Sequence, residues 1–194
     1  MGKIRSALEI ALEKTESVKS DKSSIGQFEA RQKGKKSANE FLEGSKKSLE
    51  EDIKKCSKEE QGNFKQGIFD VLISQIILPG TKDDLKRIEA AGQGLASLIN
   101  SKQFTEITKQ MIQIFTQFLD ETEQYEGAIK QQYAPKLRQK EEELSRRVGR
   151  AVKIDPFQDP EFVAFYNQNM NALKANYQAA VDQIREEAVK LFGS

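Results

Sequence analysis

The sequence predicts an all-α protein: an elongated antiparallel helical bundle with long, coiled-coil-like helices and an N-terminal helical arm. Apolar residues recur every three or four positions through most of the 194 residues, and no segment shows the two-residue alternation of a half-buried strand. Charged residues make up 31% of the chain and hydrophobic residues 37%, which suits helices with a large solvated surface. We expect a charged arm in residues 1–56 and a bundle core in residues 57–194 that includes a C-terminal helix over residues 160–192, together forming one structural unit.

The arm has few apolar residues for its length. A first helix is predicted over residues 4–18, because apolar side chains fall on one face of it. That face reads Ile4, Leu8, Ala11, Leu12, Thr15 and Val18. The polar residues 20–23 predict a break, and the spacing of Ser24 and Gln27 predicts a capping box that starts a second helix, which stops near Gly44. The arm has too few apolar residues to fold alone, so we expect it to pack along the core or on a second subunit.

The first half of the core contains three predicted helices. Ser57 and Glu60 predict another capping box, and the helix after it is apolar on most faces from Ile68 onward, so we expect it to be the most buried. Pro79–Gly80 ends this helix, and Thr81–Asp84 begins the next with an acidic first turn, which the helix dipole favours. The third helix has apolar or aromatic residues at alternating three- and four-residue steps: Phe104, Ile107, Met111, Ile114, Phe118 and Tyr125, interrupted once at Glu121.

Prolines divide the second half of the core. Pro135 has no backbone N–H, so we expect it to kink or end the long helix, with a further charged helix over residues 137–151. Asp159 is suited to cap a helix and Pro160 to be its first residue, which predicts the start of the C-terminal helix. One face of this helix carries our candidate self-association or partner interface: Phe162, Tyr166, Leu173, Tyr177 and Ile184.

The composition excludes several kinds of chemistry. The chain has no histidine, which removes histidine general bases, histidine-containing catalytic triads and histidine-ligated metal sites. A lone Cys56 cannot form an internal disulfide and favours a reducing compartment. No apolar run reaches the length that spans a membrane, and the N-terminus has no secretory apolar core. We therefore expect a cytoplasmic protein that is not an enzyme, with no catalytic residues, no metal and no cofactor.

The most basic window of the chain is residues 136–153. It contains our candidate polyanion contact, Arg146, Arg147, Arg150 and Lys153. The alternative, which we favour, is a solvated helix face that balances the acidic residues 141–143. No aromatic residue is interleaved here for base stacking, and the net charge of the whole chain is only +1, so nucleic acid is the less favoured partner.

Two small clusters have competing interpretations. Gly92 and Gly94 lie inside a helical pattern, which favours close helix packing over a phosphate loop and leaves a hollow for an apolar ligand as a third reading. Asp155, Asp159 and Glu161 could collect around a cation, but no calcium-binding loop pattern is present and Asp159 is already explained as a helix cap.

The segment Ala7–Thr15 resembles the start of some uncharacterised bacterial helical proteins. Its letters are ALEIALEKT, an amphipathic pattern confined to the first helix. The resemblance implies a bacterial, cytoplasmic origin and transfers no activity and no site residue.

The sequence as a whole favours an interaction role. We expect a non-enzymatic helical scaffold or adaptor that binds protein partners, including a second copy of itself, through amphipathic helices, with a homodimer as the first guess. The first alternative is a helical bundle that binds a small apolar ligand near Gly92 and Gly94. The second is a nucleic-acid-associated protein that uses residues 136–153.

Overall fold

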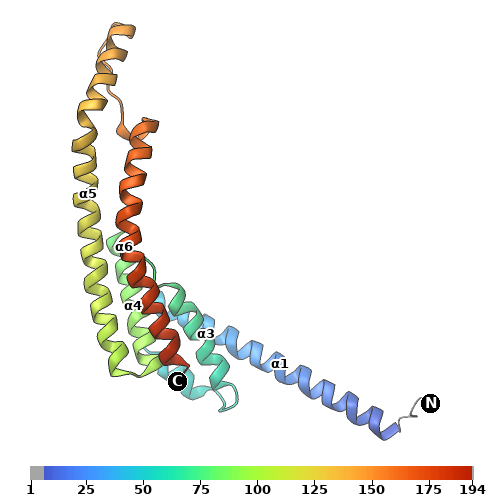
Figure 1. Ribbon diagram of the computed structural model, residues 1–194. Helices are drawn as coiled ribbons and strands as arrows, with labels where there is room; N and C mark the ends of the chain where they lie inside the picture. The colour runs from blue at the N-terminus through green and yellow to red at the C-terminus, as the bar shows by residue number, and fades with distance from the viewer. Residues whose placement is uncertain (1–6, 194) are drawn as a thin grey trace. The chain divides into compact units, whose positions relative to one another are not determined.

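The computed structural model describes the backbone of residues 7–193 and the side chains of residues 24–193. Every regular element in this part of the chain is a helix, so the predicted all-α bundle is confirmed (Figure 1). The elements in order are α1 (Ala7–Leu42), α2 (Glu50–Lys55), α3 (Gln61–Ser74), α4 (Lys82–Ile99), α5 (Lys102–Val148), the 3-10 turn η1 (Pro156–Gln158) and α6 (Pro160–Phe192). None of these helices is both long enough and apolar enough to cross a membrane.

The chain forms two compact units. The first comprises Met1–Gln75 and Ala90–Ser101, and the second comprises Ile76–Glu89 and Lys102–Ser194. This division differs from the boundary between residues 56 and 57 that we expected from composition. The difference arises because α1 packs on α3 within the first unit, so the charged arm and the apolar helix that follows it share one core.

Two glycines let α1 and α3 approach closely. A Cβ atom on Gly34 would overlap the carbonyl oxygen of Phe64 and lie 3.2 Å from the backbone nitrogen of Ile68. A Cβ atom on Gly67 would likewise overlap the carbonyl oxygen of Arg31. A glycine inside a helix costs about 1 kcal/mol relative to alanine, so these positions are explained by the close packing that only glycine permits here.

Ion pairs at the edges hold the first unit together. The guanidinium of Arg31 in α1 contacts the carboxylate of Asp70 in α3 with an N–O distance of 2.6 Å. Asp52 in α2 accepts a hydrogen bond of 2.7 Å from the buried hydroxyl of Ser37 and pairs with Lys46, which also lies 2.7 Å from Glu40. The hydrogen bond from Lys46 lowers the pKa of Asp52, so the carboxylate stays ionised and links α1, the following loop and α2.

The predicted break at residues 20–23 is wrong, and of the kink or end expected at Pro135 the end does not occur. α1 runs without a break through residues 20–23 and through the predicted capping box at Ser24. The run 20–23 contains neither glycine nor proline, and serine and aspartate are only mildly unfavourable inside a helix, so the helix continues. α5 likewise continues through Pro135 to Val148 and does not end there. The buried Tyr133 before the proline and the half-buried Leu137 after it pack on the same cluster, which offsets the lost hydrogen bond.

Other predicted boundaries are confirmed. α1 ends at Leu42, and Gly44 follows in the left-handed region with φ of +76°. At the start of α4, the Thr81 backbone N–H donates to Asp84 Oδ2 at 2.8 Å and the Asp84 N–H donates to Thr81 Oγ1 at 3.1 Å. Asp159 caps α6 by accepting a hydrogen bond of 3.1 Å from the backbone N–H of Glu161.

The second unit is built on an antiparallel hairpin of α5 and α6 (Figure 1). The Phe118 and Tyr177 rings lie 5.0 Å apart, while the Tyr133 and Phe162 rings lie 5.3 Å apart, so residue numbers rise along α5 as they fall along α6. The first buried residues of α5 alternate at four- and three-residue steps. They are Phe104, Thr108, Met111, Phe115 and Phe118. The opposing buried residues of α6 are Phe162, Met170, Leu173, Val181, Ile184 and Ala188.

Gly34→Ala should destabilise the first unit, whereas Gly26→Ala should not. The added methyl at residue 34 would overlap the α3 backbone, and such overpacking costs about 1–3 kcal/mol. Gly26 lies in the same helix with nothing within 4 Å of an added Cβ, so alanine there should stabilise by up to about 1 kcal/mol. Urea unfolding of both variants measures the difference. Equal stabilities would show that α1 and α3 do not pack through these glycines.

Candidate interaction site at the end of the α5–α6 hairpin

The connection between α5 and α6 is a fixed structure. Gly149 ends α5 with φ of +72°, a conformation that favours glycine. The chain then returns along the helix that it has just left. The backbone N–H of Val152 donates to Ser145 Oγ at 2.9 Å, and the N–H of Ile154 donates to Glu141 Oε1 at 2.9 Å. These side-chain acceptors hold the returning segment against the last turns of α5.

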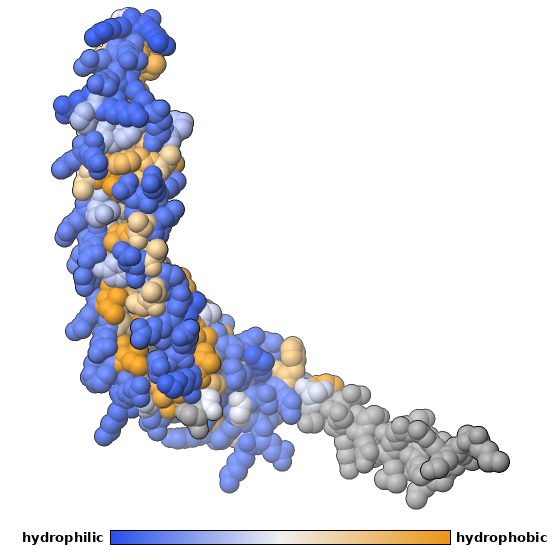
Figure 2. All heavy atoms as spheres, viewed as in Figure 1, coloured by the Kyte–Doolittle hydropathy of each residue, from blue (hydrophilic) through white to orange (hydrophobic). Residues whose placement is uncertain are grey.

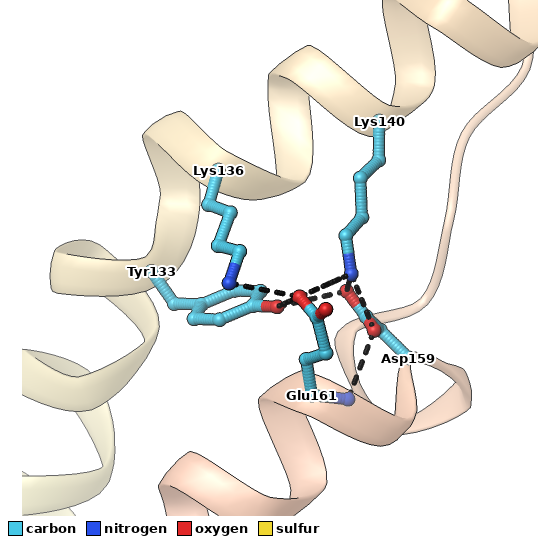
Figure 3. Close-up of polar contacts among 5 residues, drawn as sticks. All are labelled: Tyr133, Lys136, Lys140, Asp159 and Glu161. Atoms are coloured by element: carbon cyan, nitrogen blue, oxygen red, sulfur yellow. Dashed lines mark hydrogen bonds and ion pairs between the residues drawn. The ribbon is translucent and has the colours of Figure 1, made fainter.

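Below this connection, five polar side chains join the two helices, and we call them the polar cluster: Tyr133, Lys136, Lys140, Asp159 and Glu161. Figure 3 shows that the first three come from α5 and that the two carboxylates come from the start of α6. Lys140 Nζ lies 2.7 Å from Asp159 Oδ2 and 2.9 Å from Glu161 Oε2. Lys136 Nζ lies 2.8 Å from the same Glu161 oxygen, and the Tyr133 hydroxyl donates to Asp159 Oδ2 at 3.0 Å.

Every pKa shift in the polar cluster moves the pKa of the group further from pH 7. Hydrogen bonds from Lys136 and Lys140 lower the pKa of Glu161 to about 2. The hydrogen bond from Lys140 lowers the pKa of Asp159, and those carboxylates in turn raise the pKa of Lys140. Burial raises the pKa of Tyr133. A general acid or base works best with a pKa near the operating pH, so this arrangement is suited to fastening two helices and not to proton transfer.

The end of the hairpin exposes basic and apolar side chains together, and we call residues 144–153 the hairpin tip. The structure places all four predicted basic residues there. Arg146 is 3.9 Å from Glu142 and Lys153 is 3.2 Å from Glu141, whereas Arg147 and Arg150 have no ion pair within the described chain. The exposed apolar residues of the tip are Leu144, with 41% of its surface accessible, and Val148, with 53%. Figure 2 shows apolar atoms beside hydrophilic ones at this end of the hairpin.

A shallow hollow of about 290 Å³ lies on one side of the tip. Its lining includes Leu144, Arg147, Ile154 and Pro160. Four charged groups line it: Lys140 and Asp159 pair with each other, and Glu143 and Arg147 lie one helical turn apart without an ion pair in the described chain.

The predicted interface on α6 is largely occupied within one chain. Phe162 is fully buried, and Leu173 and Ile184 are 8% and 7% exposed. Tyr166 and Tyr177 are half-buried and pack against the cluster formed by α5 and α6. Burial and a hydrogen bond to Glu121 raise the pKa of Tyr177 to about 12. These side chains therefore hold the hairpin closed.

The predicted glycine site lies in the first unit. Gly92 and Gly94 are both buried in α4. A Cβ atom on Gly94 would lie 2.9 Å from Leu72 Cδ1 and 3.0 Å from Phe41 Cε1, so the space in front of this glycine is filled by side chains. An apolar hollow elsewhere, beside Met111 and Ile184, has a volume of about 130 Å³, below the roughly 300 Å³ at which ligand pockets usually begin.

The sequence predicted that Asp159 caps α6, but it did not predict the contacts of Asp159 with Tyr133 and Lys140. The predicted grouping of Asp159 with Glu161 is real, but the cation between them is the ammonium of Lys140. Among the described residues no group of three or more metal-ligating side chains is placed to hold an ion. Lys136 and Lys140 follow Tyr133 at helical three- and four-residue steps, and this spacing was the available signal.

These features define the class: an all-α protein whose second unit is an antiparallel helical hairpin with a basic, partly apolar end. The chain belongs to a family described as "Family of unknown function (DUF6657)", whose model matches residues 50–190. The match contains the whole hairpin tip and the polar cluster, and it begins after α1. No curated protein matched the chain. No solved structure matched it.

Asp159→Ala should destabilise the hairpin more than Asp155→Ala. The Asp159 carboxylate caps α6 and also accepts from Tyr133 and Lys140, so its loss should cost about 2 kcal/mol. Asp155 is exposed and accepts only from the backbone N–H of Phe157 at 3.0 Å, at the start of a three-residue turn. Thermal or urea unfolding compares the two variants. A smaller loss for Asp159→Ala than for Asp155→Ala would contradict the role given to the polar cluster.

The polar cluster should make stability fall in acid. The pKa of Glu161 is about 2 in the folded chain, below its ordinary 4.5, so its contribution is complete above about pH 5 and is lost as the pH falls toward 2. Glu161→Gln should flatten the curve of unfolding free energy against pH in this window. Glu143→Gln, an exposed carboxylate without an ion pair in the described chain, should leave the slope unchanged. Parallel curves for wild type and Glu161→Gln would show that Glu161 does not contribute to the loss of stability in acid.

Proposed function

We propose that this protein is a non-enzymatic helical scaffold that binds protein partners, a second copy of itself first among them, through an open face of α1. The observation that supports this is the difference in length between α1, with 36 residues, and α3, with 14. The Arg31–Asp70 pair and the contact of Gly34 with Phe64 show that the two helices run antiparallel and give their register. Only four residues of α3 follow Asp70, so α3 covers α1 no further than about residue 27.

Near this point α1 exposes two large apolar side chains. Ile25 is 56% and Phe28 is 63% exposed. The sequence continues this pattern toward the N-terminus, with Val18 one heptad before Ile25 and further apolar residues at Leu8 and Ala11. Burial of Ile25 and Phe28 against another helix would stabilise this part of α1, so these two side chains support a partner helix here.

A second copy fits this face on grounds of symmetry. Most soluble oligomers are homo-oligomers, and a two-fold axis lets one patch serve both subunits. The aromatic and aliphatic residues that we expected to form an interface on α6 pack inside the hairpin, and the most exposed large apolar side chain in the described chain is Phe28 of α1, which favours α1 as the surface for self-association. We place the protein in the cytoplasm, where its single thiol at Cys56 would stay reduced; burial raises the pKa of this thiol, which favours its neutral form.

The wild-type chain should be a dimer at tens of micromolar, and Ile25→Glu or Phe28→Glu should make it a monomer. Each change puts a carboxylate into the apolar contact between helices. Gln27→Glu adds the same charge at an exposed position of the same turn and should leave the dimer intact. Light scattering coupled to size-exclusion chromatography measures the mass. A monomeric wild type, or equal effects of all three changes, would refute self-association through α1.

A further inference from the structure

We propose that the hairpin tip docks on the surface of an anionic lipid bilayer. This goes beyond the scaffold function, because it concerns a different surface in the other compact unit. Three properties of residues 144–153 support docking on a bilayer: their charge, their exposed apolar side chains and their small area.

The first property is the positive charge of the tip. Four of its ten residues are basic and none is acidic. The two lysines of the polar cluster are matched by the carboxylates of Asp159 and Glu161, so the cluster adds no net charge below the tip. The acidic residues 141–143 precede the tip: two of them engage Arg146 and Lys153, and the third, Glu143, lies one helical turn before Arg147 without forming an ion pair in the described chain. Arg147 and Arg150 remain without an ionic partner in the described chain, in position to bind external phosphates.

The apolar residues lie among these cations. Leu144 and Val148 are one helical turn apart and so fall on the same side of the last turn of α5, 41% and 53% exposed. Arg147 lies between them in the sequence. Aliphatic side chains that enter the headgroup region while arginines contact lipid phosphates are the usual pattern of peripheral membrane binding. A long arginine stem allows its charged group to stay at the interface while Val148 lies deeper.

The size and composition of the tip favour a bilayer over other anionic partners. A stable protein interface takes about 800 Å² from each side, which is large for the ten residues at the end of a two-helix hairpin. Nucleic acid is disfavoured because residues 144–153 contain no aromatic side chain for base stacking. A bilayer needs no such area, since each basic residue near an anionic surface contributes independently and the attraction reaches about a Debye length.

The backbone of the tip is organised before any docking. Ser145 and Glu141 hold the N–H groups of Val152 and Ile154, so the returning segment keeps Arg150 at the end of the hairpin. A surface that is already ordered loses little conformational entropy when it binds.

Co-sedimentation with vesicles tests the proposal. The full chain should bind vesicles that contain phosphatidylserine and not vesicles of pure phosphatidylcholine, and the binding should weaken as salt is raised. Arg147→Gln/Arg150→Gln should lower the affinity about 25-fold, or about fivefold per arginine. Arg138→Gln/Lys174→Gln removes the same charge at exposed positions of the hairpin outside the tip and should leave binding unchanged. Equal losses in the two double variants would overturn the proposal.

Val148→Trp gives an independent readout, because the chain contains no tryptophan. Its emission should shift to the blue with phosphatidylserine vesicles and stay constant with pure phosphatidylcholine. Anionic vesicle binding without a shift would overturn the insertion of Val148.

Binding of duplex DNA as tight as that of vesicles, and unchanged by Val148→Ser, would assign the tip to nucleic acid instead. Phe28→Glu combined with Val148→Trp should be monomeric and should still give the blue shift, so a failure of self-association and a failure of docking are told apart.

Discussion

The buried carboxylate of Asp159 is the group on which the end of the hairpin depends. Only 5% of this residue is exposed, yet its two oxygens accept from the N-terminus of α6, from the Tyr133 hydroxyl and from Lys140. A buried charge is tolerated only when it is paired and hydrogen-bonded, and here all of its partners come from the elements that must meet. One residue therefore fixes where α6 begins and which turn of α5 it faces.

The same pairing determines where the basic charge of the hairpin is exposed. Without the carboxylates of Asp159 and Glu161, Lys136 and Lys140 would add unpaired positive charge to α5 below the basic residues of the tip. The ion pairs to these carboxylates neutralise both lysines. Arg147 and Arg150, which have no ion pair in the described chain, then lie at the tip beside Leu144 and Val148, where charge can combine with apolar contact. The polar cluster thus joins α5 to α6 and also neutralises the two lysines nearest the tip.

Local chemistry made the helix boundaries at Asp159, Thr81 and Gly44 predictable from sequence, because capping and left-handed termination depend on neighbouring residues alone. The uninterrupted course of α5 through Pro135 was not predictable in this way. Its cause is tertiary, since Tyr133 and Leu137 pack on α6 on either side of the proline. The contact of Gly34 with Phe64 and the partners of Lys140 also required knowing which distant segments lie together. The basic residues of the tip were found from composition, but their division into paired and unpaired cations was not.

Self-association through α1 and docking through the tip would reinforce each other. Two arginines and two aliphatic side chains give one tip only weak affinity for a bilayer, because each contact contributes little against the cost of immobilising the protein. Joining two chains through α1 makes the second docking event intramolecular, and its strength then depends on the effective concentration of the second tip at the surface. A chain of modest affinity per copy would in this way attach more firmly as a dimer than as a monomer. Dimerisation would therefore strengthen docking because a dimer carries two tips. No conformational change needs to pass between the two units of one chain.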